Sequence, residues 1–327
     1  MLDKFLKTVN QHNCIAITGL AKNTGKTCVL NTILNDGNSK IRGVTSIGYD
    51  GENTDQVTGT AKPTIYVKKG TLIATADGLL SKCDITRELL SYTGFNTPMG
   101  EVIIVKALSD GYVQLAGPST RSQMEAIVKM LQNYGAEQIL IDGAASRKST
   151  AAIAFSDACI LATGAAFSHN PDKLIEETVH FARLLSLPPY PVSDLSRIKH
   201  INTLDNEALT QYTNELATNL SQTDYANVFL EGAINTEFIK QLLNISKLPQ
   251  LSIIAEDGTR YLFNSQMFDQ LTRRGIKLFV KNHINLIAIT VNPTSPNGTI
   301  LDSDYLSKEI NEQIDIPTLN PQMSNMI

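Results

Sequence analysis

The segment GLAKNTGKT, residues 19–27, restricts the possible folds more than any other part of this sequence. It follows a short apolar run, Ile15–Ile17, and precedes a segment, Val29–Leu34, whose apolar residues recur at helical spacing. Backbone N–H groups converge where such a loop enters a helix, and the helix dipole favours negative charge there. The succession of strand, glycine-containing loop and helix therefore predicts a phosphate-binding loop within an α/β fold.

The last residues of this loop have the chemistry that a phosphate site needs. Gly25 allows the backbone to approach a ligand, Lys26 supplies a positive charge to the β- and γ-phosphates, and the Thr27 hydroxyl can ligate Mg2+. The usual spacing would place the first glycine at position 20, where Leu20 stands, and Gly19 lies one residue earlier. A surface turn rich in Gly and Lys is the alternative interpretation. The predicted nucleotide-binding residues are Gly19, Lys22, Asn23, Thr24, Gly25, Lys26, Thr27 and Cys28.

Magnesium bound to phosphates also needs an acidic residue, usually at the carboxyl end of another parallel strand. Asp142 follows the apolar run that ends at Ile141, and Gly143-Ala144 would let the chain turn beside a ligand. Asp50, in GYDGENTD, is the second candidate and could hold or orient a water molecule. We predict Lys26, Asp50 and Asp142 as catalytic residues, and Thr27, Asp50 and Asp142 as metal ligands. Helix capping for Asp142 and a solvated turn for Asp50 are the alternatives.

Three further features are weaker candidates. Arg147 and Lys148 follow Asp142 within range of a developing negative charge, and the segment 117–120 precedes a predicted helix. Asn292, before Pro293, is a candidate for reading a base, although turn initiation is the favoured interpretation. The guanine-reading pattern Asn-Lys-x-Asp is absent from the sequence, which favours ATP over GTP.

Composition excludes several other classes of protein. A formal net charge of −4 without a basic stripe argues against a nucleic-acid partner. The four cysteines are far apart and are interpreted as reduced, buried thiols rather than zinc ligands or a disulfide framework. The charged N-terminus does not resemble a secretory signal, and no apolar run approaches membrane-spanning length. We therefore expect a cytoplasmic protein with no membrane partner.

The fold class predicted is α/β, a mostly parallel sheet with a P-loop core followed by a second α/β unit. The proline-rich segment Leu187–Ser196 is the candidate boundary. It divides the chain into a nucleotide-binding domain, 1–187, and a second domain, 197–327, expected to contact a partner or to couple nucleotide binding to it. The second domain is expected to contain the helix Thr236–Leu243 and the strands Lys277–Val280 and Leu286–Val291. The runs Thr64–Lys68 and Thr71–Ala74 are expected to form a hairpin around Lys69-Gly70.

The ordered motifs GLAKNTGKT, GYDGE and ILIDGAA resemble the dethiobiotin synthetase and cobyric acid synthase branch of P-loop proteins. The resemblance implies that Thr27, Asp50 and Asp142 share a magnesium ion, with Asp142 standing where the branch usually has Glu. An ATP-dependent small-molecule ligase or kinase of this type is one reading of the function. The substrate motifs of the branch are not found in this chain.

A closer resemblance covers most of the chain, through TSIGYDGENTDQVTGTAKPTIYVKKGTLIATA, ALSDGYVQLAGPSTRSQ, LIDGAASRKS and IAITVNPTSPNG. These stretches are similar to the P-loop subunit of the ATP-dependent reactivase for lysine 5,6-aminomutase. The resemblance implies a Mg-ATP-driven chaperone that, with a companion reactivase subunit, removes damaged cobalamin from an adenosylcobalamin-dependent aminomutase. A D-x-H-x-x-G cobalamin motif is absent, which fits a chaperone better than a cobalamin binder. A nucleotide-sensing scaffold without hydrolysis is the third reading.

Overall fold

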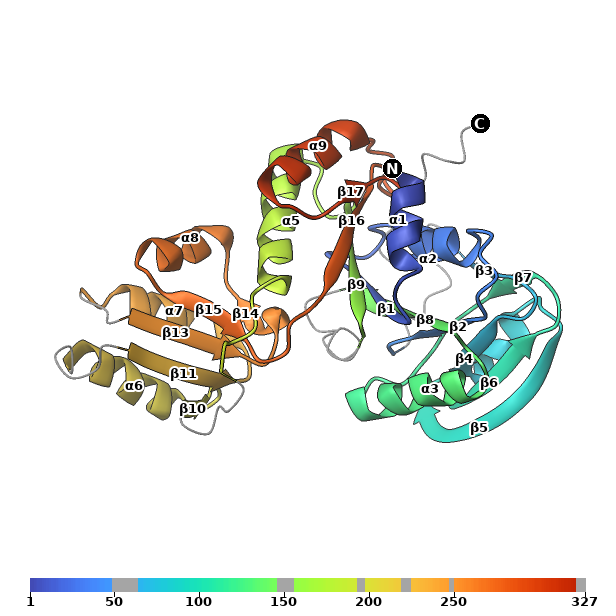
Figure 1. The fold of residues 1–327 in the computed structure, drawn as a ribbon, viewed down its shortest axis with the longest axis horizontal. Coiled ribbons are helices and arrows are strands. Elements are labelled where there is room, and N and C mark those ends of the chain that lie inside the picture. Colours follow the sequence, from blue (N-terminus) through green and yellow to red (C-terminus); the bar gives the residue numbers. More distant parts are fainter. Residues whose placement is uncertain (49–63, 146–155, 193–197, 219–224, 247–249, 322–327) are drawn as a thin grey trace. The chain divides into compact units, whose positions relative to one another are not determined.

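The computed structural model describes residues 1–48, 64–145, 156–192, 198–218, 225–246 and 250–321. The chain divides into two compact units, shown in Figure 1. Unit 1 contains Met1–Thr178 and Leu286–Ile327, and unit 2 contains Val179–Asn285. Unit 2 is therefore an insertion in the sequence of unit 1. The predicted α/β class is confirmed, because a large and mostly parallel sheet with several helices forms unit 1.

The sheet of unit 1 has nine strands in the order β17-β16-β9-β1-β8-β2-β4-β6-β5. Adjacent strands from β17 to β4 are parallel, whereas β6 pairs antiparallel with both β4 and β5. The central strands β1 and β9 are buried along their whole length, as expected for parallel strands covered on both faces. The strands are β1 Cys14–Gly19, β2 Arg42–Ser46, β4 Leu72–Ala76, β5 Arg87–Thr97, β6 Gly100–Ala107, β8 Gln138–Ala145, β9 Ala158–Gly164, β16 Leu286–Asn292 and β17 Thr318–Leu319.

Helices cover both faces of this sheet. Figure 1 shows α1 and α2 on one face and α3 on the opposite face. Phe5 of α1 and Val29 of α2 join Ile15 and Leu140 of the sheet in one apolar core. The helical elements are α1 Leu2–Val9, α2 Lys26–Leu34, the 3-10 helix η1 Asp77–Lys82, α3 Arg121–Asn133, α5 Pro171–Leu185 and α9 Ser303–Gln313. Two short strands, β3 Ile65–Val67 and β7 Gly111–Val113, form a separate antiparallel pair.

Unit 2 has its own parallel sheet, in the order β10-β11-β13-β15, and its own apolar core. Asn235 and Asn264 cap two of its helices by accepting hydrogen bonds from the backbone N–H groups of Phe238 and Met267. Its elements are β10 Lys199–Asn202, α6 Asn206–Thr218, β11 Tyr225–Glu231, β12 Ile234–Asn235, α7 Thr236–Leu243, β13 Gln250–Ala255, η3 Gly258–Arg260, β14 Tyr261–Leu262, α8 Ser265–Arg273 and β15 Lys277–Val280.

Two predictions are wrong, one about the domain to which a strand belongs and one about a hairpin. The strand Leu286–Asn292 does not belong to the second unit, because it pairs with β9 in the sheet of unit 1. The C-terminal segment of the chain therefore belongs to unit 1. The boundary between the units lies between Thr178 and Val179, rather than at the proline-rich segment. The turn at Lys69-Gly70 is present, but β3 pairs with β7 and β4 lies between β2 and β6. No hairpin forms between β3 and β4.

None of the helices within the described ranges is long and apolar enough to cross a membrane.

Candidate phosphate-binding site

The predicted phosphate loop lies at the carboxyl end of β1, between Gly19 and the first residue of α2, Lys26. Strand β1 is hydrogen-bonded to β8 on one side and to β9 on the other. After β1 the chain passes to β2, which lies on the β8 side of β1. After β9 the next strand of this sheet is β16, which lies on the opposite side of β1. Open α/β sheets bind ligands at such a reversal of strand order, outside the carboxyl ends of the strands.

Two residues of the loop have left-handed backbone conformations. Gly25 has φ +93°, and Asn23 has φ +60° and is the single non-glycine residue with positive φ among the described residues. Asn adopts this conformation more readily than most residues, because its short side chain can form local hydrogen bonds. Alternation of right- and left-handed residues turns successive N–H groups towards one concavity, which is the geometry of an anion-binding nest. The backbone of the loop is therefore compatible with a bound phosphate.

Gly19 is required by packing within the loop. A Cβ atom at Gly19 would lie 2.5 Å from Thr24 Oγ1 and 3.2 Å from both Cγ and Cδ of Lys26. The missing side chain thus leaves room for the stem of Lys26 over the end of β1. Thr24 is buried, and its hydroxyl donates a hydrogen bond to the Ala21 carbonyl at 3.0 Å, which closes the loop.

The unusual position of the first glycine also has a structural explanation. Leu20, at the position where glycine is usual, donates its backbone N–H to the carbonyl oxygen of Ala162 in β9 at 3.1 Å. The chain therefore still follows the sheet at Leu20. The close approach that demands a glycine occurs one residue earlier, under the side chains of Thr24 and Lys26.

Asp142 lies on the strand next to the loop. It is in register with Ile17 of β1 and with Ser46 of β2, and its Oδ1 atom is buried while the residue as a whole is partly exposed. The predicted turn at Gly143-Ala144 is wrong, because β8 continues to Ala145, which pairs with Gly19. A Cβ atom at Gly143 would lie only 2.7 Å from the Ile17 carbonyl oxygen. Gly143 is thus needed for the close approach of β8 to β1, rather than for a turn.

The structure locates two of the three predicted metal ligands. Thr27, in the first turn of α2, and Asp142, on the adjacent strand, both belong to the carboxyl edge of the sheet around β1. Asp50 lies outside the described residues, as do Arg147 and Lys148. In the described part of the chain, no group of three or more His, Cys, Asp and Glu residues could hold a metal ion. A site made by Thr27, Asp50 and Asp142 therefore stays a prediction.

Residues 117–120 are connected to Gly48, which follows β2, by two backbone hydrogen bonds. Gly117 donates its N–H to the Gly48 carbonyl at 3.1 Å, and the Gly48 N–H donates to the Pro118 carbonyl at 3.2 Å. The start of α3 and the end of β2 are thus joined at the carboxyl edge of the sheet. This arrangement brings the weaker anion-binding candidate to the same edge as the phosphate loop.

Asn292 makes a contact that the sequence did not reveal. Its Oδ1 atom accepts a hydrogen bond from the Thr294 N–H at 3.2 Å, which confirms the predicted role in a turn. Its Nδ2 atom also donates to the Asn23 carbonyl at 3.2 Å, so the side chain contacts the phosphate loop itself. Pairing of β16 with β9 creates this contact, and no local sequence signal announces that pairing.

The cysteines match the predicted reduced state, but only two of them are buried. All four are free thiols, and burial raises the pKa of Cys14 and of Cys159 to about 12, with Asp157 adding to the effect at Cys14. Cys28, in the first turn of α2, and Cys83 are partly exposed.

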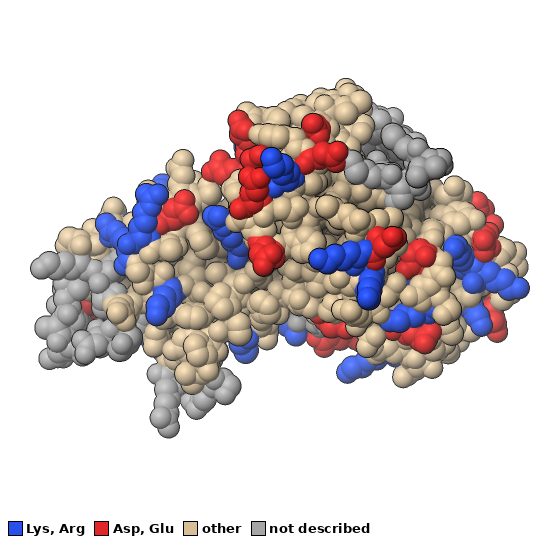
Figure 2. Space-filling model, turned by 45° about the horizontal axis from the view of Figure 1, so that its top comes forward, with Lys and Arg blue, Asp and Glu red and all other residues tan. Residues whose placement is uncertain are grey.

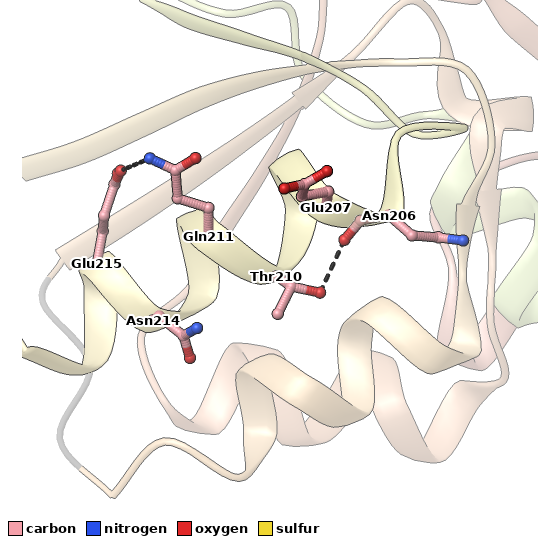
Figure 3. Close-up of a pocket in the computed structure, with 6 residues that line it drawn as sticks. All are labelled: Asn206, Glu207, Thr210, Gln211, Asn214 and Glu215. Atoms are coloured by element: carbon pink, nitrogen blue, oxygen red, sulfur yellow. Dashed lines mark hydrogen bonds between the residues drawn. The ribbon is translucent and has the colours of Figure 1, made fainter.

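Two features of the described surface differ from the phosphate loop. On the face drawn in Figure 2, the described Lys and Arg side chains are interspersed with Asp and Glu. A hollow on α6 of unit 2, shown in Figure 3, is lined by polar side chains from a single helix. Two of them hydrogen-bond within that helix, Gln211 to Glu215 at 3.0 Å and Thr210 to the Asn206 carbonyl at 2.7 Å. Binding sites usually combine groups from several elements, whereas all the residues that line this hollow belong to α6.

No protein-family model matches the chain, and comparisons with curated proteins and with solved structures find no match either.

Proposed function

We propose that this protein binds Mg-ATP at the loop between β1 and α2 and hydrolyses it. The observation that carries the proposal is the packing of the Lys26 stem over Gly19, at the mouth of a loop with left-handed residues at Asn23 and Gly25. This geometry places the stem of Lys26 against the loop at the start of α2, and N–H groups at the start of a helix stabilise phosphate oxygens. The residues of the loop fit a nucleoside triphosphate.

In the proposed chemistry, magnesium neutralises charge on the phosphates when it is bound. Thr27 and Asp142 would hold the ion, and Asp50 would hold or orient water. Lys26 binds and orients the β- and γ-phosphates. Gly19 and Gly25 allow close packing in the loop, because a Cβ atom on either residue would crowd a neighbouring side chain. Hydrolysis by such positioning, without a covalent intermediate, needs little more than electrostatic stabilisation of the transition state.

We further propose that hydrolysis serves a partner protein. The similarity to the reactivase subunit favours an adenosylcobalamin-dependent aminomutase as that partner, with a companion reactivase subunit, in the cytoplasm. The order of strands in unit 2, β10-β11-β13-β15, follows the sequence without a reversal. Among these four strands there is no reversal of the kind found beside the phosphate loop, where open α/β sheets bind ligands. Its own apolar core is consistent with a contact unit.

The connections of unit 2 support coupling. Helix α5 crosses from unit 1 into unit 2, and β16 begins at Leu286, directly after unit 2 ends. Strand β16 then ends at Asn292, which contacts the phosphate loop. Nucleotide can shift the equilibrium between two states of a protein only if it binds one state more tightly than the other. The coupling free energy between two binding sites is typically about 1 to 3 kcal/mol.

Recovery of a damaged aminomutase tests the proposal. Cobalamin-inactivated aminomutase is mixed with this protein, its companion subunit, Mg-ATP and fresh adenosylcobalamin. Activity should return only with ATP, and the Lys26→Ala variant should fail to restore it. Recovery without nucleotide, or no recovery under any nucleotide condition with the cognate enzyme, would contradict reactivation. ATP turnover that instead needs a small carboxylate or amine acceptor would favour a ligase.

A further inference from the structure

The side chain of Asn292 contacts the phosphate loop at both of its left-handed residues. Its Nδ2 atom donates to the Asn23 carbonyl at 3.2 Å, and its Cβ atom lies 3.0 Å from the position that a Cβ atom would take on Gly25. Its Oδ1 atom is held by the Thr294 N–H at 3.2 Å. Both ends of the amide group are thus engaged by protein atoms, one of them in the loop.

The backbone of Asn292 is fixed by the sheet. Asn292 is in register with Gly164 of β9, and its carbonyl accepts a hydrogen bond from the Ala165 N–H at 3.0 Å. Gly164 lies so near this carbonyl that a side chain on Gly164 would collide with it. The preceding residue, Val291, is completely buried. The contact with the loop therefore comes from a rigid strand end, rather than from another loop.

We propose that Asn292 is a positioning residue that holds Asn23 and Gly25 in the conformation that binds phosphate. Left-handed residues persist where the surrounding structure enforces them, and Asn292 supplies such a restraint from β16. Asn292 acts through the loop and does not read the nucleotide base. The inference rests on the proposed binding of Mg-ATP at this loop. Its consequence is that removal of the amide weakens binding of the phosphate chain, whatever is attached to that chain.

The experiment compares two ligands and three variants. Mg-ATP and Mg-tripolyphosphate, which has no base, are titrated calorimetrically into the wild type, Asn292→Ala, Asn292→Asp and Asn297→Ala. Asn292→Ala should weaken both ligands by the same factor, between about twofold and about twelvefold, as the loss of one neutral hydrogen bond predicts. Asn292→Asp keeps the acceptor for Thr294 but loses the donor to Asn23, so it should weaken both ligands as well.

Asn297→Ala is the matched control. Its amide lies in the same connection after β16 but contacts His169 Nε2, at 3.2 Å, and Ser295 rather than the phosphate loop. This variant should bind both ligands like the wild type. The thermal unfolding temperature of each ligand-free variant is measured in parallel, to separate affinity from general stability.

Three results would overturn the inference. Weaker binding of Mg-ATP with unchanged binding of Mg-tripolyphosphate would show that Asn292 reads the base. A lower unfolding temperature of Asn292→Ala with unchanged affinity for both ligands would show a structural role alone. A wild-type protein that binds neither ligand would contradict the phosphate-loop proposal itself, and with it this inference.

Discussion

Replacement of Gly25 by alanine should damage the phosphate loop in two ways. Gly25 has φ +93°, a left-handed conformation that costs an L-residue with a side chain about 1 to 2 kcal/mol. The new Cβ atom would also lie 3.0 Å from Asn292 Cβ, at the end of a strand that cannot easily move. Crowding of this kind typically costs about 1 to 3 kcal/mol. We expect Gly25→Ala to lower the free energy of unfolding by about 2 to 5 kcal/mol, or to shift the loop and weaken Mg-ATP binding.

Gly37→Ala supplies the matched control for this prediction. Gly37 follows the same helix, has φ +79°, and has nothing within 4 Å of the position of a new Cβ atom. Its replacement should lower the free energy of unfolding by about 1 to 2 kcal/mol, from backbone conformation alone, and should leave Mg-ATP binding unchanged. Urea unfolding and calorimetric titration measure both quantities. The reasoning is refuted if Gly25→Ala is no more destabilising than Gly37→Ala and binds Mg-ATP like the wild type.

Three other predictions concern the metal, an ion pair and the inserted unit. Asp142→Asn should weaken the magnesium dependence of ATP turnover more than it weakens binding of metal-free ATP; unchanged turnover at every Mg2+ concentration would remove Asp142 from the metal site. Burial opposes ionisation of Asp36, but hydrogen bonds from Arg42 and from Asn10 outweigh it, and the pKa of Asp36 lies below its usual value. Its stabilising contribution is therefore present above the unfolded-state pKa, about 4, and is lost as pH falls through the lower folded-state pKa. At neutral pH, Asp36→Asn should lower the free energy of unfolding by about 3 kcal/mol, because it leaves the buried Arg42 charge without its carboxylate. Urea unfolding at pH 7 and pH 3 should show a smaller difference between the variant and the wild type at pH 3. A fragment of residues 1–187 lacks β16 and exposes the edge of β9, so it should aggregate or unfold more readily than the whole chain; equal stability in circular dichroism melts would contradict the placement of β16.

Local elements could be predicted from the sequence because their signals are local. The predicted helix Thr236–Leu243 and strand Lys277–Val280 have the same bounds in the structure. Apolar spacing marks both, and the N-cap of the helix, Asn235, lies next to it in the sequence. The same holds for the phosphate loop, whose strand, glycines and helix are consecutive.

The missed features depend on pairing between distant segments. Strand β16 has the composition of any buried strand, and only its hydrogen bonds with β9, more than a hundred residues earlier, place it in unit 1. The contact of Asn292 with Asn23 depends on the same pairing. Strand β5, Arg87–Thr97, was not predicted, because exposed and partly exposed residues and two register shifts interrupt a regular alternation.

The most direct measurement of the central claim is a calorimetric titration of Mg-ATP into the wild type and Lys26→Ala. Loss of a charged hydrogen-bond donor costs about 1.5 to 3 kcal/mol, so the variant should bind about tenfold to 150-fold more weakly. Its circular dichroism spectrum and unfolding midpoint should match the wild type, since Lys26 is partly exposed and contributes a charge rather than core packing. Wild-type affinity in a folded Lys26→Ala protein would contradict the assignment of residues 19–27 as a phosphate-binding loop.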